Sequence, residues 1–316
     1  MPKIGIIYGI ENTFPPALVD RINEKRVPGI VAEHVKIGAV RMAEPSGFGV
    51  IVDRVSQDID FYRAYLKNAM LNGTVIVNNP FWWSADDKFF HYSLAGKLGV
   101  AVPRTVILPH KQHPPGTSVQ SMRNLVFPID WDAVFHYVGF PAFLKPFNKA
   151  GWKHIFRVND PDEFFRAYDE TGTLCIMLQQ AILADEFFRC TVVGQEKVCV
   201  MPFAPHQPLH LRYAGNGKLV LQSLNDRMVK DALVLCRALG YDLNSVEFAM
   251  QSGIPYAIDF LNPAPDADMH SIGAENFEWL VENVAQLAIS KAVSGRPSHA
   301  PYRWSYFLNP ESLQLK

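Results

Sequence analysis

The chain has 316 residues, 48% of them hydrophobic, and its 30 Lys and Arg residues nearly balance 31 Asp and Glu residues. A chain of this length buries a large core and is expected to fold as two or three globular units. The net charge of −1 gives no long-range attraction to nucleic acid or to an anionic membrane, so neither is expected as a partner. No apolar run is long enough for a membrane span, and Glu11 interrupts the apolar start, so we expect a cytoplasmic protein.

The cysteines show no metal-ligand spacing, and one pair of histidines has such a spacing only if it lies on a helix. The chain contains four cysteines, Cys175, Cys190, Cys199 and Cys236. Three of them lie in apolar segments typical of buried strands, and we interpret all four as reduced core thiols. His206 and His210 have a spacing that can bind metal on a helix, but two nearby prolines indicate a loop and argue against zinc.

In the first part of the chain, short apolar runs alternate with helical stretches. The expected segments are a strand at 3–9, a helix at 15–25, a strand at 48–52, a mixed stretch at 61–71 and a strand at 74–79. Because strands alternate with helices, we predict a doubly wound parallel α/β domain over residues 1–85. This domain lacks the G-x-G-x-x-G motif of a dinucleotide-binding enzyme, which argues against an oxidoreductase.

The rest of the chain is expected to be α+β. A helix is predicted at 85–98, and from residue 142 onward the strand-like runs AFLKPF, HIFRV, CIMLQQAI, FFRCTVVG and KVCVMPF are separated by turn residues, as in an antiparallel sheet. Helices are expected at 161–168, where an Asn or Asp cap precedes Pro161, and at 226–239 and 276–294. We place one subdomain at residues 86–180 and a second at 181–316.

The segment SVEFAMQSGIPYAIDFLNPAPDAD predicts two strands joined by a tight Ser252-Gly253 turn. A hairpin of this kind can bring together the oxygen atoms of Glu247, Asp259 and Asn262. Carboxylate and amide oxygens suit Mg²⁺, which usually takes one or two carboxylates together with substrate phosphates. The alternative is a surface hairpin with solvated acids.

Lys145 lies within the apolar run AFLKPF, where an ammonium group is costly to bury without an anionic partner. A nucleotide phosphate would provide that partner, whereas an edge strand that turns Lys145 to solvent is the alternative.

The order of Lys88, Lys145, the LQQAI segment, Glu247, Asp259 and Asn262 resembles that of ATP-grasp enzymes. The subgroup it resembles most is the glutathione synthetase and ribosomal-protein glutamate ligase type. The resemblance implies an ATP-grasp fold of two α+β subdomains after the α/β domain. It also implies ATP and Mg²⁺, or Mn²⁺, as cofactors of a carboxylate–amine ligase that forms an acylphosphate. Its partners would be small-molecule carboxylate and amine substrates, by analogy an amino acid or peptide, and a homodimer is an open alternative.

The resemblance also assigns roles to individual residues. Lys88 and Lys145 would contact the nucleotide phosphates, and the hinge that contains Gln179, Gln180 and Ile182 would offer backbone groups to adenine. Asp185 or Glu186 would hold the ribose, with Glu186 favoured. Glu247 and Asp259, twelve positions apart as in the subgroup, would bind the metal with Asn262. Arg212 would hold the acyl substrate or its phosphate, although a solvated loop arginine is the alternative.

The chain departs from the family pattern at three places. The loop NKAGWKH has a single glycine, Gly151, so the charges of Lys149 and Lys153 would replace backbone amides over the phosphates. Asn262 follows Asp259 by three positions rather than two, and we expect a β-bulge at 260–261 to restore its direction. Gln180 stands where the family generally has Glu. These departures leave open a non-catalytic nucleotide-binding or partner protein.

The aromatic triplet at 81–83 is expected to cover a seam between domains, with a substrate pocket as the alternative.

Overall fold

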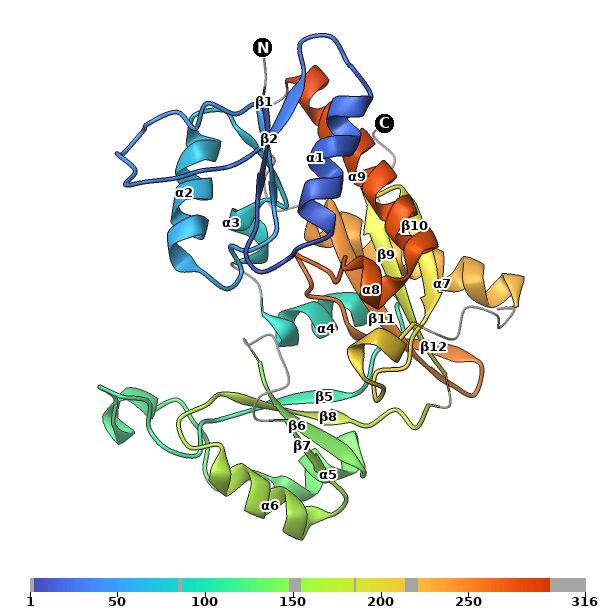
Figure 1. The fold of residues 1–316 in the computed structure, drawn as a ribbon. Helices are drawn as coiled ribbons and strands as arrows, with labels where there is room; N and C mark the ends of the chain where they lie inside the picture. Colours follow the sequence, from blue (N-terminus) through green and yellow to red (C-terminus); the bar gives the residue numbers. More distant parts are fainter. Residues whose placement is uncertain (1–2, 85–86, 148–154, 185, 214–220, 296–316) are drawn as a thin grey trace, which may run out of the picture. The chain divides into compact units, whose positions relative to one another are not determined.

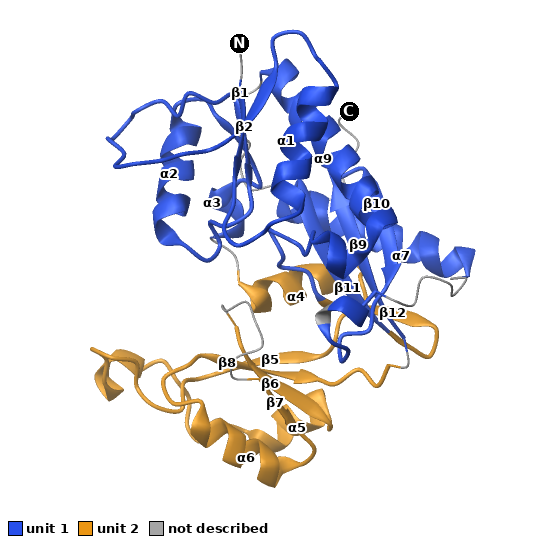
Figure 2. Ribbon diagram, in the orientation of Figure 1, with its two compact units in different colours: residues 1–85, 185–249, 259–316 blue, residues 86–184, 250–258 orange. Residues whose placement is uncertain are grey.

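The computed structural model describes residues 3–84, 87–147, 155–184, 186–213 and 221–295. The chain forms two compact units, which Figure 2 draws in different colours. Unit 1 consists of residues 1–85, 185–249 and 259–316, and unit 2 of residues 86–184 and 250–258. The three-part division of the chain expected from the sequence stays a prediction. None of the described helices is both long and apolar enough to cross a membrane.

Unit 1 opens with a parallel sheet of strand order β2-β1-β3-β4 (Figure 1). Its strands are β1 (Lys3–Ile7), β2 (Val31–His34), β3 (Val50–Asp53) and β4 (Val75–Val77). All pairings are parallel, with Ile4 opposite Val50 and Ile51 opposite Ile76. Strands covered on both faces need apolar residues at consecutive positions, which explains the runs KIGII and VIV. The parallel α/β domain expected at the start of the chain is confirmed.

Helices cover both faces of this parallel sheet. Helices α1 (Phe14–Glu24) and α9 (Ala274–Ser294) share one apolar core with Ile4 and Ile6 of β1. Helix α2 (Asp60–Leu71) packs on the opposite face against Ile7. The alternation of Ile6 and Ile7 between the two cores follows from the two-residue period of a strand. Helix α9, which closes the described chain, therefore packs against its first strand.

A second sheet has the strand order β10-β9-β11-β12, and it belongs to unit 1 except for residues 250–258 of its last hairpin, which are counted in unit 2. Its strands are β9 (Glu186–Val193), β10 (Lys197–Pro202), β11 (Leu243–Gln251) and β12 (Ile254–Asp259). Strands β9 and β10 are antiparallel, with Cys190 opposite Val200. Helix α7 (Gln222–Leu239) packs against both of them, and it begins four residues before the expected Asp226. Val193 and Leu243 enter the core that contains α9, so this one core joins the two sheets.

Unit 1 also contains three short helices, and a tight turn joins the two strands of the β11–β12 hairpin. The helices are α3 (Pro80–Trp83), η2 (Leu209–Leu211) and α8 (Met269–Ile272). Ser252 and Gly253 join β11 to β12 with φ angles of 52° and 75°. Two consecutive residues with positive φ are typical of two-residue hairpin turns, so the predicted Ser252-Gly253 turn is confirmed.

Unit 2 contains an antiparallel sheet of strand order β5-β8-β6-β7. Its strands are β5 (Thr105–Leu108), β6 (Ala142–Pro146), β7 (Phe156–Val158) and β8 (Ile176–Gln180). Its helices are α4 (Lys88–Lys97), η1 (Val119–Met122), α5 (Trp131–Val138) and α6 (Pro161–Glu170). The Asp160 carboxylate accepts a hydrogen bond from the Glu163 amide at 2.8 Å, which confirms the predicted cap before Pro161. Leu144 and Phe164 lie in the core between the sheet and α6.

Candidate functional site

The exit of the β11–β12 hairpin positions three of the predicted site residues in unit 1. Glu247 lies within β11, and Asp259 is the last residue of β12, the neighbouring strand. The side-chain amide of Asn262 donates to the backbone oxygen of Ser245 at 3.2 Å, which holds Asn262 beside β11. The β-bulge expected at 260–261 is wrong, because β12 ends at Asp259 and the alternation of a strand no longer applies at Asn262.

Arg189 of β9 is a cation with several bonded partners beside this exit. Its guanidinium donates to the Glu247 carboxylate and to the Tyr213 hydroxyl, and it lies 4.1 Å from the centroid of the Phe203 ring. The Arg189 and Glu247 side chains are only 12% and 14% exposed. Burial acts to lower the pKa of Arg189, but the attraction of Glu247 and then of Tyr213 outweighs it and raises this pKa. Arg189 is therefore a fixed, permanently charged group.

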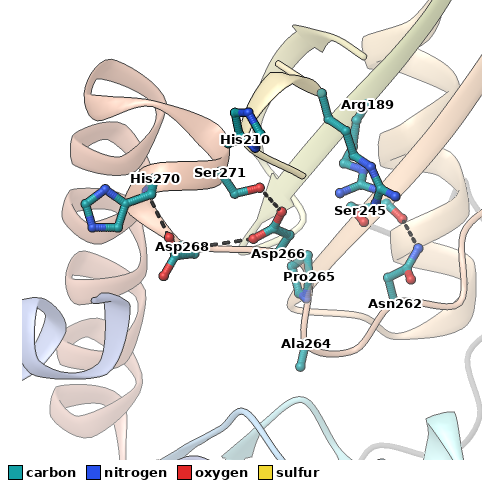
Figure 3. Close-up of a pocket in the computed structure, with 11 residues that line it drawn as sticks. Arg189, His210, Ser245, Asn262, Ala264, Pro265, Asp266, Asp268, His270 and Ser271 are labelled. Carbon is teal, nitrogen blue, oxygen red and sulfur yellow. Dashed lines mark hydrogen bonds between the residues drawn. The ribbon is translucent and has the colours of Figure 1, made fainter. Parts of the chain in front are cut away.

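A cavity of about 380 Å³ opens beside Arg189 in unit 1 (Figure 3). Arg212 and His210 line it from the segment around η2, and Ser245 and Asn262 line it from the hairpin and its exit. The Arg212 guanidinium donates to the backbone oxygen of Gln207 at 3.0 Å, which orients the side chain.

The other wall of the cavity is acidic and runs into α8. Asp266 accepts hydrogen bonds from the Ser271 hydroxyl at 2.5 Å and from the Asp268 amide at 3.1 Å. Asp268 accepts from the His270 amide at 2.8 Å and from the Thr13 hydroxyl at 3.0 Å. The cavity thus has arginines on one side and anchored carboxylates on the other, a lining that suits a ligand with both an anionic and a cationic group.

Unit 2 carries the two lysines predicted to meet nucleotide phosphates. Lys88 begins α4, which Asp87 caps by accepting from the Phe90 amide at 2.8 Å. The Lys145 ammonium on β6 donates to the Tyr92 hydroxyl at 3.0 Å and lies 5.0 Å from the centroid of the Tyr92 ring. The Lys145 side chain is therefore half-buried beside a neutral hydroxyl, and its predicted contact with a nucleotide phosphate stays a prediction. Helix α4 supplies both Lys88 and Tyr92 to this region.

The predicted adenine hinge includes the last two residues of β8 and the residues just after it in unit 2. The Gln179 side chain is buried and donates to the Thr105 hydroxyl at 2.8 Å, so it supports the sheet. The backbone amide of Gln180 donates to the Arg104 oxygen at 2.9 Å, and that of Ala181 to the Pro141 oxygen at 3.0 Å. Because these two amide groups already have partners, a base at this hinge would meet Ile182 or the carbonyl groups.

The predicted site residues divide between the two units. Unit 1 holds Glu186, Arg212, Glu247, Asp259 and Asn262, of which Arg212 and Asn262 line the same cavity. Unit 2 holds Lys88, Lys145, Gln179, Gln180 and Ile182. Lys149, Lys153 and Asp185 lie outside the described residues. The described part of the chain contains no group of three or more His, Cys, Asp or Glu residues arranged to hold a metal ion.

Sequence reasoning gave no role to Arg189, Tyr213, His270 or Ser271. Arg189 carries a usable signal, because an arginine in the apolar strand FFRCTVV needs a buried anion just as Lys145 does. Tyr213, His270 and Ser271 carry no such signal, because only tertiary contacts bring them to the cavity wall or to Arg189.

The fold and the cavity define a protein with a parallel α/β sheet, two antiparallel sheets and an arginine-lined pocket at a hairpin exit. No protein-family model and no curated protein matches the sequence. Solved structures do match the fold. The VanG D-Ala:D-Ser ligase from Enterococcus faecalis is 14% identical, with a TM-score of 0.63 over 92% of this chain and 99% of that chain.

Two further structures agree with this match. A RimK domain ATP-grasp protein from Sphaerobacter thermophilus is 16% identical, with a TM-score of 0.62 over 92% of this chain and 99% of that chain. The D-alanine–D-alanine ligase from Bacillus anthracis, complexed with ATP, is 15% identical, with a TM-score of 0.61 over 95% and 100% of the two chains. The chain has the ATP-grasp fold, as the resemblance in its sequence implied.

Proposed function

We propose that this chain is an ATP-dependent carboxylate–amine ligase that acts on an amino acid or a peptide-like substrate. In this reaction a substrate carboxylate attacks the γ-phosphate of ATP to give an acylphosphate and ADP, and an amine then displaces phosphate. Phosphoryl transfer depends mainly on positioning and charge stabilisation, so no side-chain nucleophile is required. The ATP-grasp fold supports this proposal, and PsnB, a ligase of similar fold, was solved with a minimal precursor, Mg and ADP.

The observation that carries the proposal is the pairing of Arg189 and Arg212 in one cavity beside Asn262. Glu247 and Tyr213 hold Arg189 in place before any substrate arrives. A guanidinium that needs no reorganisation is well suited to stabilise negative charge that develops on an acylphosphate. Arg212 on the same cavity would orient the substrate carboxylate.

Lys88 and Lys145 of unit 2 are the residues we assign to the nucleotide phosphates. The Tyr92 hydroxyl holds the Lys145 ammonium at 3.0 Å, which restricts the lysine to one direction. A lysine restricted in this way loses less side-chain entropy when it binds a phosphate. The hinge with Gln179, Gln180 and Ile182 would take the adenine, and Glu186 the ribose.

The residues at the hairpin exit fit a magnesium ion by their donor chemistry. Glu247 and Asp259 offer carboxylate oxygens and Asn262 offers an amide oxygen, which are the hard donors that Mg²⁺ and Mn²⁺ prefer. The ion would supply neutralisation of phosphate charge. Glu247 also accepts from Arg189, so the same carboxylate would link the metal site to the substrate cavity.

Isothermal titration calorimetry with ATP tests the proposal before the substrate is known. We expect ATP to bind the native chain more tightly with Mg²⁺ than without it, and Asp259→Asn to remove most of that difference. Asp20→Asn is the matched control, because Asp20 is an exposed carboxylate on α1 in the same unit. If the control keeps the metal effect, ADP formation can be screened with pairs of amino acids.

Two results would count against the ligase. Absence of ATP binding with and without Mg²⁺ would contradict both the nucleotide site and the reaction. ATP binding that does not depend on Mg²⁺ or on Asp259 would instead favour a non-catalytic nucleotide-binding protein, the alternative raised by the altered loop at 148–154.

A further inference from the structure

The connection between β5 and α5 in unit 2, residues 109–130, exposes an unusual amount of apolar surface. Val119 is 70% exposed, Leu125 is 36% exposed and Phe127 is 68% exposed. Exposed apolar side chains that are scattered singly need no explanation, but a contiguous group marks a binding surface. No residue of the proposed ligase site lies in this connection.

The connection borders a cavity of about 800 Å³. Trp131 and Tyr168 form its aromatic part, and Val119, Met122, Leu125 and Phe127 add apolar walls. Trp131 and Tyr168 lie with their ring centroids 5.7 Å apart in an edge-to-face arrangement. A volume of several hundred Å³ and a mostly apolar and aromatic lining are typical of sites for small molecules.

The charged side chains that line this cavity are all basic. Lys111, Arg123, His110 and His113 are among its lining residues, and no Asp or Glu is. Lys111 forms an ion pair with Asp169, whereas the Arg123 guanidinium donates to the amide oxygen of Gln120 at 3.1 Å. A neutral amide leaves the charge of Arg123 uncompensated, so an anionic ligand gains an electrostatic partner there.

Hydrogen bonds within unit 2 order the connection that borders the cavity. The Gln112 amide donates to the Gly172 oxygen at 2.9 Å, which ties the start of the connection to the end of α6. The Leu125 amide donates to the Met122 oxygen at 3.1 Å, and Ser118 caps η1. A preformed site reduces the ordering entropy that a ligand must overcome.

We propose that this cavity binds a small amphiphilic anion: a compact aromatic or aliphatic body with one carboxylate or sulfonate group. The body lies against Trp131 and Phe127, and the anionic group meets Arg123. This binding site is separate from the proposed ligase reaction and does not depend on it.

The test uses 8-anilinonaphthalene-1-sulfonate as the probe, with its fluorescence as the measure of binding to the full chain. We expect saturable binding to one site, and about fivefold weaker binding to Arg123→Gln because an ion interaction near the surface is lost. Phe127→Ala should weaken binding by about tenfold through the loss of apolar contact. N-phenyl-1-naphthylamine, which has the same aromatic body without the sulfonate, should bind weakly and show no dependence on Arg123.

Two control variants match these changes outside the cavity lining. Val126→Ala removes an exposed apolar side chain from the same connection, and Arg166→Gln removes an exposed arginine from α6. Both should bind the probe as the native chain does. Probe binding that is equal in all four variants, equal binding of the uncharged probe, or displacement only by acidic peptides and not by 1-naphthoate would each overturn the proposal.

Discussion

Trp82 of α3 closes directly over Gly240, the left-handed residue that ends α7. Gly240 has φ of 77°, and a Cβ atom placed there would lie 2.1 Å from Cε3 of the Trp82 ring. This contact joins the segment after the parallel sheet to the helix before β11, all within unit 1. Trp82 thus covers a join between parts distant in the sequence but within one unit, and the expected seam between domains at residues 81–83 stays a prediction.

Gly240→Ala should therefore destabilise the protein for two reasons. The left-handed backbone costs an alanine about 1 kcal/mol, and displacement of Trp82 adds about 1–3 kcal/mol of overpacking. Gly253→Ala is the matched control, because Gly253 has φ of 75° but nothing within 4 Å of its added Cβ. Urea unfolding should show a loss for Gly240→Ala that is at least twice that of the control. Equal losses of unfolding free energy in the two variants would mean that the Trp82 ring moves away from the new Cβ atom without destabilising the protein.

The ion pair between Arg189 and Glu247 predicts strong coupling between the two residues. Arg189→Gln leaves a mostly buried carboxylate without its cation and should cost about 3 kcal/mol of unfolding free energy. Adding Glu247→Gln removes that charge. The double variant should therefore lose about 1–3 kcal/mol less unfolding free energy than the two single variants lose together. Chemical denaturation of the native chain, the two single variants and the double variant gives the four unfolding free energies of this double-mutant cycle. Additive losses would show that the two side chains do not depend on each other.

Asn78 is a second position where we expect a substitution to reduce stability. It is far from the proposed site residues in the sequence, but its side chain is bonded to the hairpin exit. Its buried side-chain amide donates to the backbone oxygens of Leu243 at 2.6 Å and Pro263 at 2.8 Å, and its oxygen accepts from the amides of Asp242 and Leu243. Asn78→Ala leaves these groups unsatisfied and should cost about 3 kcal/mol.

The neighbouring Asn79 provides the control for this prediction. Its side chain accepts a single hydrogen bond, from the Phe81 amide at 2.9 Å, as the N-cap of α3. Asn79→Ala should cost about 1 kcal/mol in thermal or urea unfolding. Because Asn78 holds both flanks of the exit, Asn78→Ala should also weaken Mg·ATP binding more than Asn79→Ala does. The reverse order in either measurement would contradict the anchoring role.

The ion pairs of Glu282, on α9, should make the folded state less stable in acid. Lys25, the C-cap residue of α1, donates to the Glu282 carboxylate at 2.5 Å, and this bond, followed by those from Gln286 and Arg21, lowers the pKa of Glu282 from 4.5 to about 2. A carboxylate with a depressed folded-state pKa contributes stability above its unfolded pKa and loses it as the pH falls through the folded one. The α1–α9 contact should therefore weaken between about pH 4.5 and pH 2.

The Glu282 carboxylate is 33% exposed, so solvent screening reduces the expected contribution to about 1 kcal/mol. Unfolding measured from pH 6 downward should show a smaller pH dependence for Glu282→Gln than for the native chain. Glu24→Gln, which removes a 71% exposed partner of Arg21, should keep the native dependence. If the two variants follow the same curve, the acid effect arises elsewhere.

Local patterns predicted most of the secondary structure because each pattern reports its own segment. The cap before α6, the Ser252-Gly253 turn and the long strands of both antiparallel sheets follow from neighbouring residues alone. Strands β2 and β5 and helix α5 were missed, because runs as short as VAEH and TVIL do not distinguish a strand from a loop or helix without a partner. The bulge at 260–261 was wrong because a sequence does not mark where β12 ends.

The sequence by itself determined the order of the elements and the chemical character of the residues at their ends. Apolar periodicity, caps and charge depend only on residues close together in the chain. That order was enough for the resemblance to ATP-grasp enzymes and for Glu247, Asp259 and Asn262 as candidate ligands. Only the tertiary structure placed α9 on β1 and joined Arg189 to Glu247 and Tyr213. These contacts span tens to hundreds of residues, and their partners are selected by the packing of the whole core rather than by neighbours in the chain.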